Sequence, residues 1–108
     1  MTDKIIVLVT CGSRKEARKI ARALVGQRLA ACVSEIGVSV ASTYRWKGKL
    51  ESAKESLLLI KTSKKRFTAV RNAVRKLHSY EAPEIIALPI AAGSREYLDW
   101  IAASVKPR

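Results

Sequence analysis

The residues of this sequence best suited to bind a metal ion are a cysteine, the single histidine and two glutamates, namely Cys11, His78, Glu81 and Glu84. Thiolate and imidazole are suitable ligands for copper and zinc, and a carboxylate can assist them. No Cys-x-x-Cys or His-x-x-x-His pair is present, so spacing alone does not define a site. A structural interpretation stays open, in which Cys11 is a small apolar loop residue and His78 stabilises the C-terminal end of a helix.

Cys11 also precedes a Gly12-Ser13 pair at an expected helix start, which would suit a nucleophile beside anion-binding amides. A phosphatase-like thiol site needs a longer loop of amides that ends in arginine, and the interval from Cys11 to Arg14 is too short. Nothing in the sequence indicates that the single histidine lies beside a serine or cysteine for which it could act as a general base. We therefore expect that the protein is not an enzyme.

The elements that would position these residues begin with a strand and a helix. Residues 4–10 form a continuous apolar and β-branched run, which predicts a buried strand. Ser13 and Glu16 have the spacing of a capping box, so a helix is expected to begin there. Gly26 is expected to end that helix.

An extended hairpin and a third strand are expected next. Residues 31–44 form a long extended stretch, in which Gly37 indicates a bulge or bend. Lys47-Gly48 predicts a turn. Residues 55–62 contain another apolar run, which predicts a second buried strand.

The remainder of the chain predicts a helix, a strand and a helix. The second helix is expected from a cap at Ser63 to about His78, with an apolar face made by Phe67, Val70, Val74 and Leu77. Residues 85–90 would form the last core strand, and a short terminal helix would begin at Ser94. This βαββαβ order plus a helix predicts one α+β domain over residues 1–108. We expect a ferredoxin-like sandwich with an extended β-hairpin and a C-terminal helix.

This order of elements places the candidate metal ligands at one end of the sheet. Cys11 ends the first strand, His78 ends the second helix, and Glu81 and Glu84 precede the last strand, which neighbours the first in this fold. The four side chains are therefore expected to converge. Cys32 begins the second strand at the opposite end, so no disulfide with Cys11 is expected within one subunit.

Composition sets limits on location and partners. The chain has 108 residues, two cysteines and no apolar stretch long enough for a membrane span, so we expect a cytoplasmic protein with no membrane partner. The net charge of +12 comes from 21 basic and 9 acidic residues. Unspecific nucleic-acid contact is one interpretation, but the expected strands at 4–10 and 55–62 have no aromatic residue to stack on bases. Specific nucleic-acid recognition is therefore not expected.

Five sequence blocks in fixed order resemble the CutA divalent-cation-tolerance family over nearly the whole chain. They are LAACV at 29–33, YRWKGK at 44–49, LLIKT at 58–62, HSYEAPEIIALPI at 78–90 and YLDWI at 97–101. The resemblance implies a ferredoxin-like subunit in a homotrimer shaped like PII-type signalling proteins, with no assigned catalytic activity. It also implies a role in tolerance of divalent cations, copper especially, with copper ligands near Cys11 and His78.

The functional hypothesis is therefore a trimeric protein that binds or senses copper or another divalent metal, which it does not need for folding. The alternative is a trimeric scaffold or a PII-like module that binds a small ligand without a metal role. Three aromatic residues bear on this choice, namely Tyr44, Trp46 and Trp100. We expect them to pack between subunits, as aromatic residues often do at obligate interfaces, although they could instead form a ligand wall.

Overall fold

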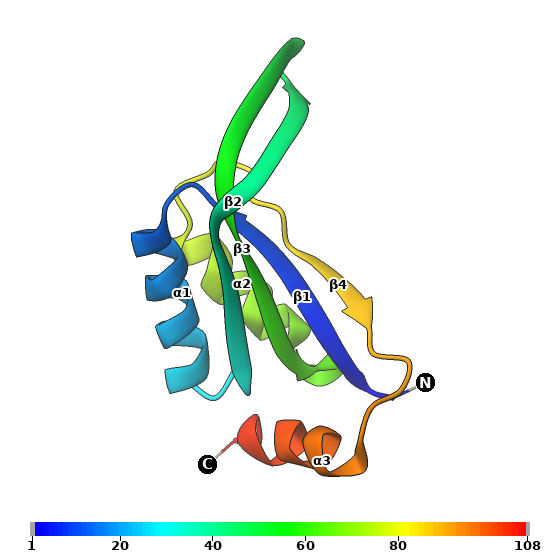
Figure 1. Ribbon diagram of the computed structural model, residues 1–108. Helices are drawn as coiled ribbons and strands as arrows, with labels where there is room; N and C mark the ends of the chain where they lie inside the picture. Colours follow the sequence, from blue (N-terminus) through cyan, green and yellow to red (C-terminus); the bar gives the residue numbers. More distant parts are fainter. Residues whose placement is uncertain (1, 108) are drawn as a thin grey trace.

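The protein is a four-stranded antiparallel sheet with two helices on one face and a third helix at its end (Figure 1). The structure is a computed structural model that describes residues 2–107. Its elements are β1 (Lys4–Cys11), α1 (Arg14–Gly26), β2 (Cys32–Trp46), β3 (Lys49–Ser63), the 3₁₀ turn η1 (Lys64–Arg66), α2 (Phe67–Leu77), β4 (Ile86–Pro89) and α3 (Arg95–Ser104). The strand order β2-β3-β1-β4 confirms the predicted ferredoxin-like α+β fold.

The central strand β1 is paired on both sides, with β3 and with β4. Because successive side chains of a strand point to opposite faces, Val7, Val9 and Cys11 all face the helices and are fully buried. Their cross-strand partners on β3, among them Ile60 and Leu58, are fully buried too. This apolar layer is what α1 and α2 cover.

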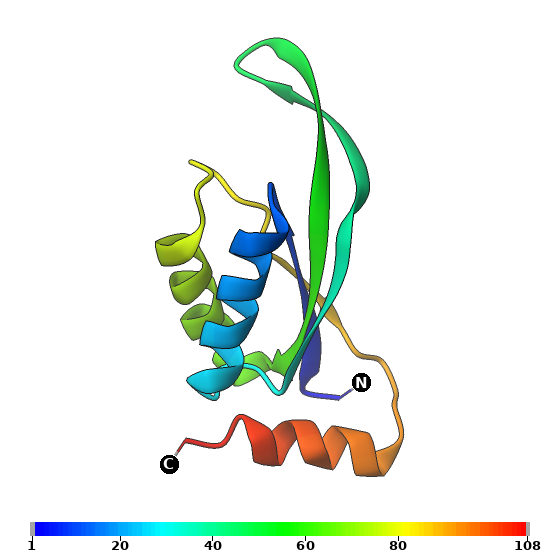
Figure 2. The ribbon, with the colours of Figure 1, turned by 60° about the vertical axis from the view of Figure 1, so that its left-hand side comes forward.

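The two covering helices contribute one apolar face each to the core. The buried residues are Ala17, Ile20 and Leu24 of α1 and Val70 and Val74 of α2. Both helices lie on the same side of the sheet, and no helix within residues 2–107 covers the opposite side (Figure 2). The sheet therefore has one packed face and one open face.

The β2–β3 hairpin extends well beyond the rest of the sheet (Figures 1 and 2). Lys47 and Gly48 form its two-residue turn with φ angles of 51° and 81°, as a tight hairpin turn requires. The third strand begins at Lys49 rather than at residue 55. The sequence prediction was too short because residues 49–54 are mainly polar and pair with β2 alone, so they lack an apolar pattern.

A bulge interrupts β2 between Ile36 and Val40, as Gly37 predicted. Val38 has a φ of 42°, and its N–H is turned onto the Ser56 hydroxyl at 3.1 Å. A Cβ atom at Gly37 would lie 2.9 Å from Nε of Arg14, so the bulge lets α1 approach the strand closely. The hairpin bends away from the sheet at this point.

The helix ends differ from the predictions in three details. Ser13 caps α1 by accepting the Glu16 N–H at 3.2 Å, but the Glu16 carboxylate is used elsewhere, so only half of the capping box forms. Gly26 is the last helical residue, and the left-handed conformation after it belongs to Arg28, with φ of 60°. Ser63 precedes the turn η1 and makes no side-chain cap, so α2 begins only at Phe67.

The terminal helix α3 packs across the end of the sheet through its buried Ile101. Two arginines fix its C-terminal end. Arg28 donates to the carbonyls of Lys106 and Ala103 at 2.8 and 3.1 Å, and Arg66 donates to Val105 at 2.9 Å. None of the helices within residues 2–107 combines the length and apolarity needed to cross a bilayer.

Leu58→Ala is expected to lower the free energy of unfolding by about 2–5 kcal/mol, because Leu58 is fully buried and the change leaves a cavity. Leu50→Ala on the same strand is the matched control, since Leu50 is 74% exposed, and it should change stability little. Urea unfolding followed by circular dichroism measures both variants. Equal losses would contradict the described packing of β3.

Candidate metal centre

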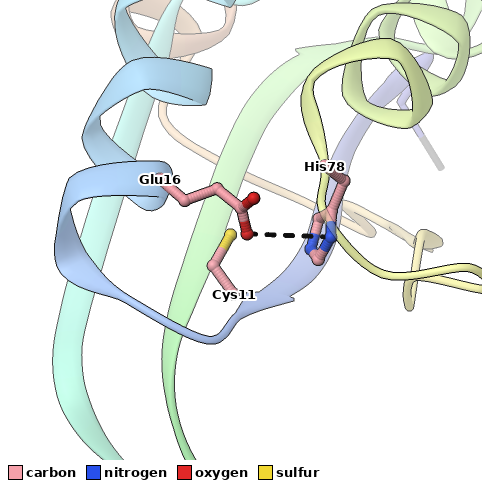
Figure 3. Close-up of side chains that lie close together, drawn as sticks. All are labelled: Cys11, Glu16 and His78. Carbon is pink, nitrogen blue, oxygen red and sulfur yellow. Dashed lines mark ion pairs between the residues drawn. The ribbon is translucent and has the colours of Figure 1, made fainter.

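Three potential ligand side chains converge beneath the end of the sheet: Cys11, Glu16 and His78. Their sulfur, oxygen and nitrogen atoms all lie within 4.8 Å of one another. The three side chains come from the end of β1, the first turn of α1 and the residue after α2, and they point toward a common centre (Figure 3). It is the one such group of three or more found among residues 2–107.

Glu16 is positioned by the way α1 begins. The Ser13 cap starts the helix two residues after β1, which places Glu16 one turn along, next to Cys11. Its carboxylate accepts the Ser79 N–H at 2.8 Å and the Ser79 hydroxyl at 3.2 Å. Glu16 therefore ties α1 to the segment that follows α2.

His78 has both ring nitrogens engaged and a fully buried side chain. Nδ1 accepts the Tyr80 N–H at 3.1 Å, and Nε2 donates to the Thr10 carbonyl at 2.7 Å. These partners assign the proton to Nε2, because a carbonyl can only accept and an N–H can only donate. Nδ1 lies 3.8 Å from the Glu16 carboxylate, which is the contact drawn in Figure 3.

The thiol of Cys11 is strongly held in its protonated form. Burial, followed by the nearby carboxylates of Glu16, Glu35 and Glu55, raises the pKa of the Cys11 thiol to about 12. Removing a proton there would add a negative charge to a buried and already acidic place. Cys11 is therefore a poor nucleophile, but the same acidic surroundings would favour a cation.

The donor set fits a copper or zinc ion in chemical type. Thiolate and imidazole suit these metals, and a carboxylate can supply a third ligand. Two changes would accompany binding, since Cys11 would lose its proton and His78 Nδ1 would exchange the Tyr80 N–H for the cation. The predicted approach of Cys11 and His78 is thus present in the structure, with Glu16 as the neighbouring carboxylate.

Glu81 and Glu84 lie outside this cluster. They line a pocket of about 590 Å³ at the root of the hairpin, together with Thr10, Tyr44, Trp46, Glu55 and Tyr80. Tyr80 separates the two sites, because its N–H meets His78 while its hydroxyl donates to Glu55 at 2.9 Å. Burial and this carboxylate partner raise the pKa of the Tyr80 phenol.

The three aromatic residues expected between subunits are divided between two places. Tyr44 and Trp46 line the hairpin pocket, and Trp100 lies on α3 with its ring centroid 5.4 Å from that of Tyr97. All three are exposed on the single chain. Their role between subunits stays a prediction.

Sequence reasoning missed Glu16 and Glu55 as site residues. The sequence assigns Glu16 wholly to the capping box, although its position three residues after Ser13 and five after Cys11 was a usable signal. Glu55 stands two residues before an apolar run, Leu57 to Ile60, that enters the core. A carboxylate at that position is unusual in a buried strand and could have drawn attention.

Cys32 is expected to react with iodoacetamide well before Cys11 in the folded, reduced protein. Cys11 is fully buried, and burial together with nearby carboxylates raises the pKa of its thiol, whereas Cys32 is partly exposed. Mass spectrometry of peptides after timed alkylation at about pH 8 measures both rates, and a urea-unfolded sample provides the control. Comparable rates for the two thiols in the folded protein would contradict the buried position of Cys11.

Comparisons with known proteins agree with this fold over the whole domain. Residues 5–104 match the family model described as CutA1 divalent ion tolerance protein. The chain is 51% identical over 96 residues to the divalent-cation tolerance protein CutA of Thermus thermophilus, which covers 89% of this chain and 92% of that protein. It is 47% identical over 93 residues to the human protein CutA, covering 86% of this chain and only 51% of the human protein.

A solved structure gives the same result. The crystal structure of CutA from Xylella fastidiosa superposes with a TM-score of 0.93 at 40% sequence identity, covering 97% of this chain and all of the other. The family resemblance carried by the five sequence blocks is thereby confirmed. The chain belongs to the CutA1 divalent ion tolerance family.

Proposed function

We propose that this protein contributes to tolerance of divalent cations by binding copper or a related metal at Cys11, Glu16 and His78. The observation that carries the proposal is the convergence of thiol, carboxylate and imidazole within 4.8 Å in a chain of this family. The bound cation would neutralise the negative charge that deprotonated Cys11 brings to the cluster. We propose no catalytic role, because the thiol is buried and protonated and both nitrogens of His78 are in use.

The distribution of charge supports a cation at this end of the sheet. Five of the nine acidic residues gather around the cluster and the neighbouring pocket, namely Glu16, Glu35, Glu55, Glu81 and Glu84. The chain as a whole carries +12, which repels cations at long range. A local group of carboxylates would therefore favour a cation at this end of the sheet.

The open face of the sheet supports assembly into the homotrimer that the family resemblance implies. Side chains that alternate with the buried ones emerge there and are only partly covered or exposed, namely Ile6, Leu8, Ile36, Leu57, Leu59, Ile86 and Leu88. A contiguous apolar surface of this kind is characteristic of a protein interface. We propose that neighbouring subunits cover it.

Titration of metal-free, reduced protein with Cu(I) and Zn(II) is expected to show saturable binding near one metal per subunit. Cys11→Ser and His78→Ala should each abolish or strongly weaken it, because each removes a ligand. Calorimetry and competition with a chromophoric chelator measure the affinities. Cys32→Ser is the matched thiol control and should bind as the wild type does.

The variants also separate this cluster from the adjacent acids. Glu16→Gln should weaken metal binding, while Glu81→Gln should change it little, since Glu81 lies outside the cluster. Binding that survives Cys11→Ser and His78→Ala together would refute the proposed site. Binding that depends on Glu81 but not Glu16 would move the site to the hairpin pocket.

Sedimentation equilibrium is expected to give a mass of three 11.9 kDa subunits for the wild type. Leu88→Lys should shift the protein toward single subunits, because a charge on the open face would be buried at the interface without a partner. Val25→Lys is the matched control, since Val25 is a similarly exposed aliphatic residue on α1. A wild type that sediments as one subunit would overturn the trimer.

A further inference from the structure

The helical layer, formed by α1, the turn η1 and α2, carries most of the net charge of the chain. It contains eleven of the 21 lysines and arginines but only one of the nine acidic residues, Glu16. The side chain of Glu16 is largely buried, and its carboxylate accepts two hydrogen bonds from Ser79. The outer surface of residues 14–26 and 64–77 is therefore positively charged.

Almost none of this charge is neutralised within the chain. No aspartate or glutamate occurs from residue 17 to 34 or from residue 56 to 80. The exposed basic side chains of the two helices are Arg14, Lys15, Arg18, Lys19 and Arg22 of α1 and Arg71, Arg75 and Lys76 of α2. Among residues 2–107, only Arg14 and Arg18 of these eight have an ion-pair partner, and they share one carboxylate, that of Glu35.

The spacing of these residues brings like charges together on each helix. Three pairs of like charge are four residues apart, namely Lys15 and Lys19, Arg18 and Arg22, and Arg71 and Arg75. Residues at this spacing are neighbours on a helix surface, so each pair destabilises its helix, whereas an alternating acid would stabilise it. A polyanion bound along the layer would relieve this repulsion.

The basic surface does not coincide with the surface proposed for assembly. Both helices cover one side of the sheet, and the open face proposed to contact neighbouring subunits is the other side (Figure 2). The apolar faces of the helices are directed at the sheet, so their exposed basic residues lie on the far side of the layer from it. The charge is therefore available both on a single chain and in an assembly through the open face.

Double-stranded DNA suits this surface better than a membrane or a single strand does. A helix that lies on an anionic membrane presents aromatic or large apolar residues that enter the bilayer. Val25 is the one exposed large apolar residue of α1 and α2, and neither helix exposes an aromatic ring. Single-stranded nucleic acid is bound by stacking its bases on such rings. The phosphates of a duplex need only basic side chains, and arginine can donate two parallel hydrogen bonds to one phosphate.

We propose that the outer surface of α1 and α2 binds the phosphate backbone of double-stranded DNA without regard to its sequence. The two helices lie side by side and contact each other, so the basic residues of both can meet one duplex (Figures 1 and 2). Each phosphate contacted releases counterions, which makes the affinity fall as salt is raised. This surface uses none of the side chains of the Cys11, Glu16 and His78 cluster and does not depend on metal binding there.

The test measures the fluorescence anisotropy of a labelled DNA duplex of about 20 base pairs, which is two helical turns. The wild type should bind saturably at about 50 mM salt and lose affinity steeply toward about 200 mM, because the logarithm of the binding constant falls with the logarithm of salt concentration by about 0.9 per phosphate contacted. Two duplexes of unrelated sequence should bind equally. A single strand of the same length and vesicles that contain phosphatidylserine are the comparison ligands.

A triple variant on α1 tests the surface itself. Lys15→Gln, Lys19→Gln and Arg22→Gln together should raise the Kd by about tenfold or more and reduce the salt slope by about one unit per residue removed. Folding should tolerate these changes, because the three side chains are exposed and have no ion-pair partner within residues 2–107, and glutamine is a good helix former.

The matched control removes the same charge from exposed positions outside the layer, by Lys47→Gln, Arg95→Gln and Lys106→Gln together. It should leave the Kd and the salt slope close to those of the wild type. Equal weakening in the two triple variants would overturn the proposal, because net charge rather than the helical layer would then govern binding. Saturable binding to the vesicles but not to the duplex, or tighter binding of the single strand, would overturn it too. Unchanged DNA binding in Cys11→Ser would support a surface separate from the metal centre, whether or not that variant still binds metal.

Discussion

The pairing of β1 with β3 on one side and β4 on the other is the constraint on which the cluster of Cys11, Glu16 and His78 depends. Its register places Cys11 opposite Ser56 and so fixes where the buried face of the sheet ends. The hydrogen bond from His78 to the Thr10 carbonyl then holds the end of α2 against that strand at 2.7 Å. This hydrogen bond brings His78 beside Cys11, although the two residues are far apart in sequence.

The sequence was sufficient for the fold and for one half of the site. Apolar runs marked β1 and the inner part of β3, and the order of elements correctly placed Cys11 and His78 at the same end of the sheet. The polar outer hairpin gave no such pattern, so its extent from Lys49 was missed. The sequence prediction also missed Glu16 as the carboxylate beside Cys11 and His78 and named Glu81 instead. To choose between them, the first residue of α1 must be known to within one turn.

A cation site in a chain of net charge +12 requires acidic residues nearby. The acidic residues at this end of the sheet fall into two groups, which differ in the partners of their carboxylates. Glu16 and Glu35 are satisfied by donors and arginines, so they act mainly on Cys11, whose thiol pKa they help to raise. Among the described residues 2–107, the Tyr80 hydroxyl is the one side-chain hydrogen-bond partner of Glu55. The same end of the sheet therefore places a hydrogen-bonded cluster of thiol, carboxylate and imidazole beside a carboxylate that has no ion-pair partner within residues 2–107.

Tyr80 connects these two places, and its position has consequences for both. Its backbone N–H occupies Nδ1 of His78, so a metal bound by that nitrogen would displace the Tyr80 backbone. Its hydroxyl donates to Glu55, and a Cβ atom at Gly12 would lie only 3.0 Å from that hydroxyl, so a side chain at position 12 would crowd the ring. A metal ion on Nδ1 of His78 would therefore change the contacts that hold Tyr80 in place.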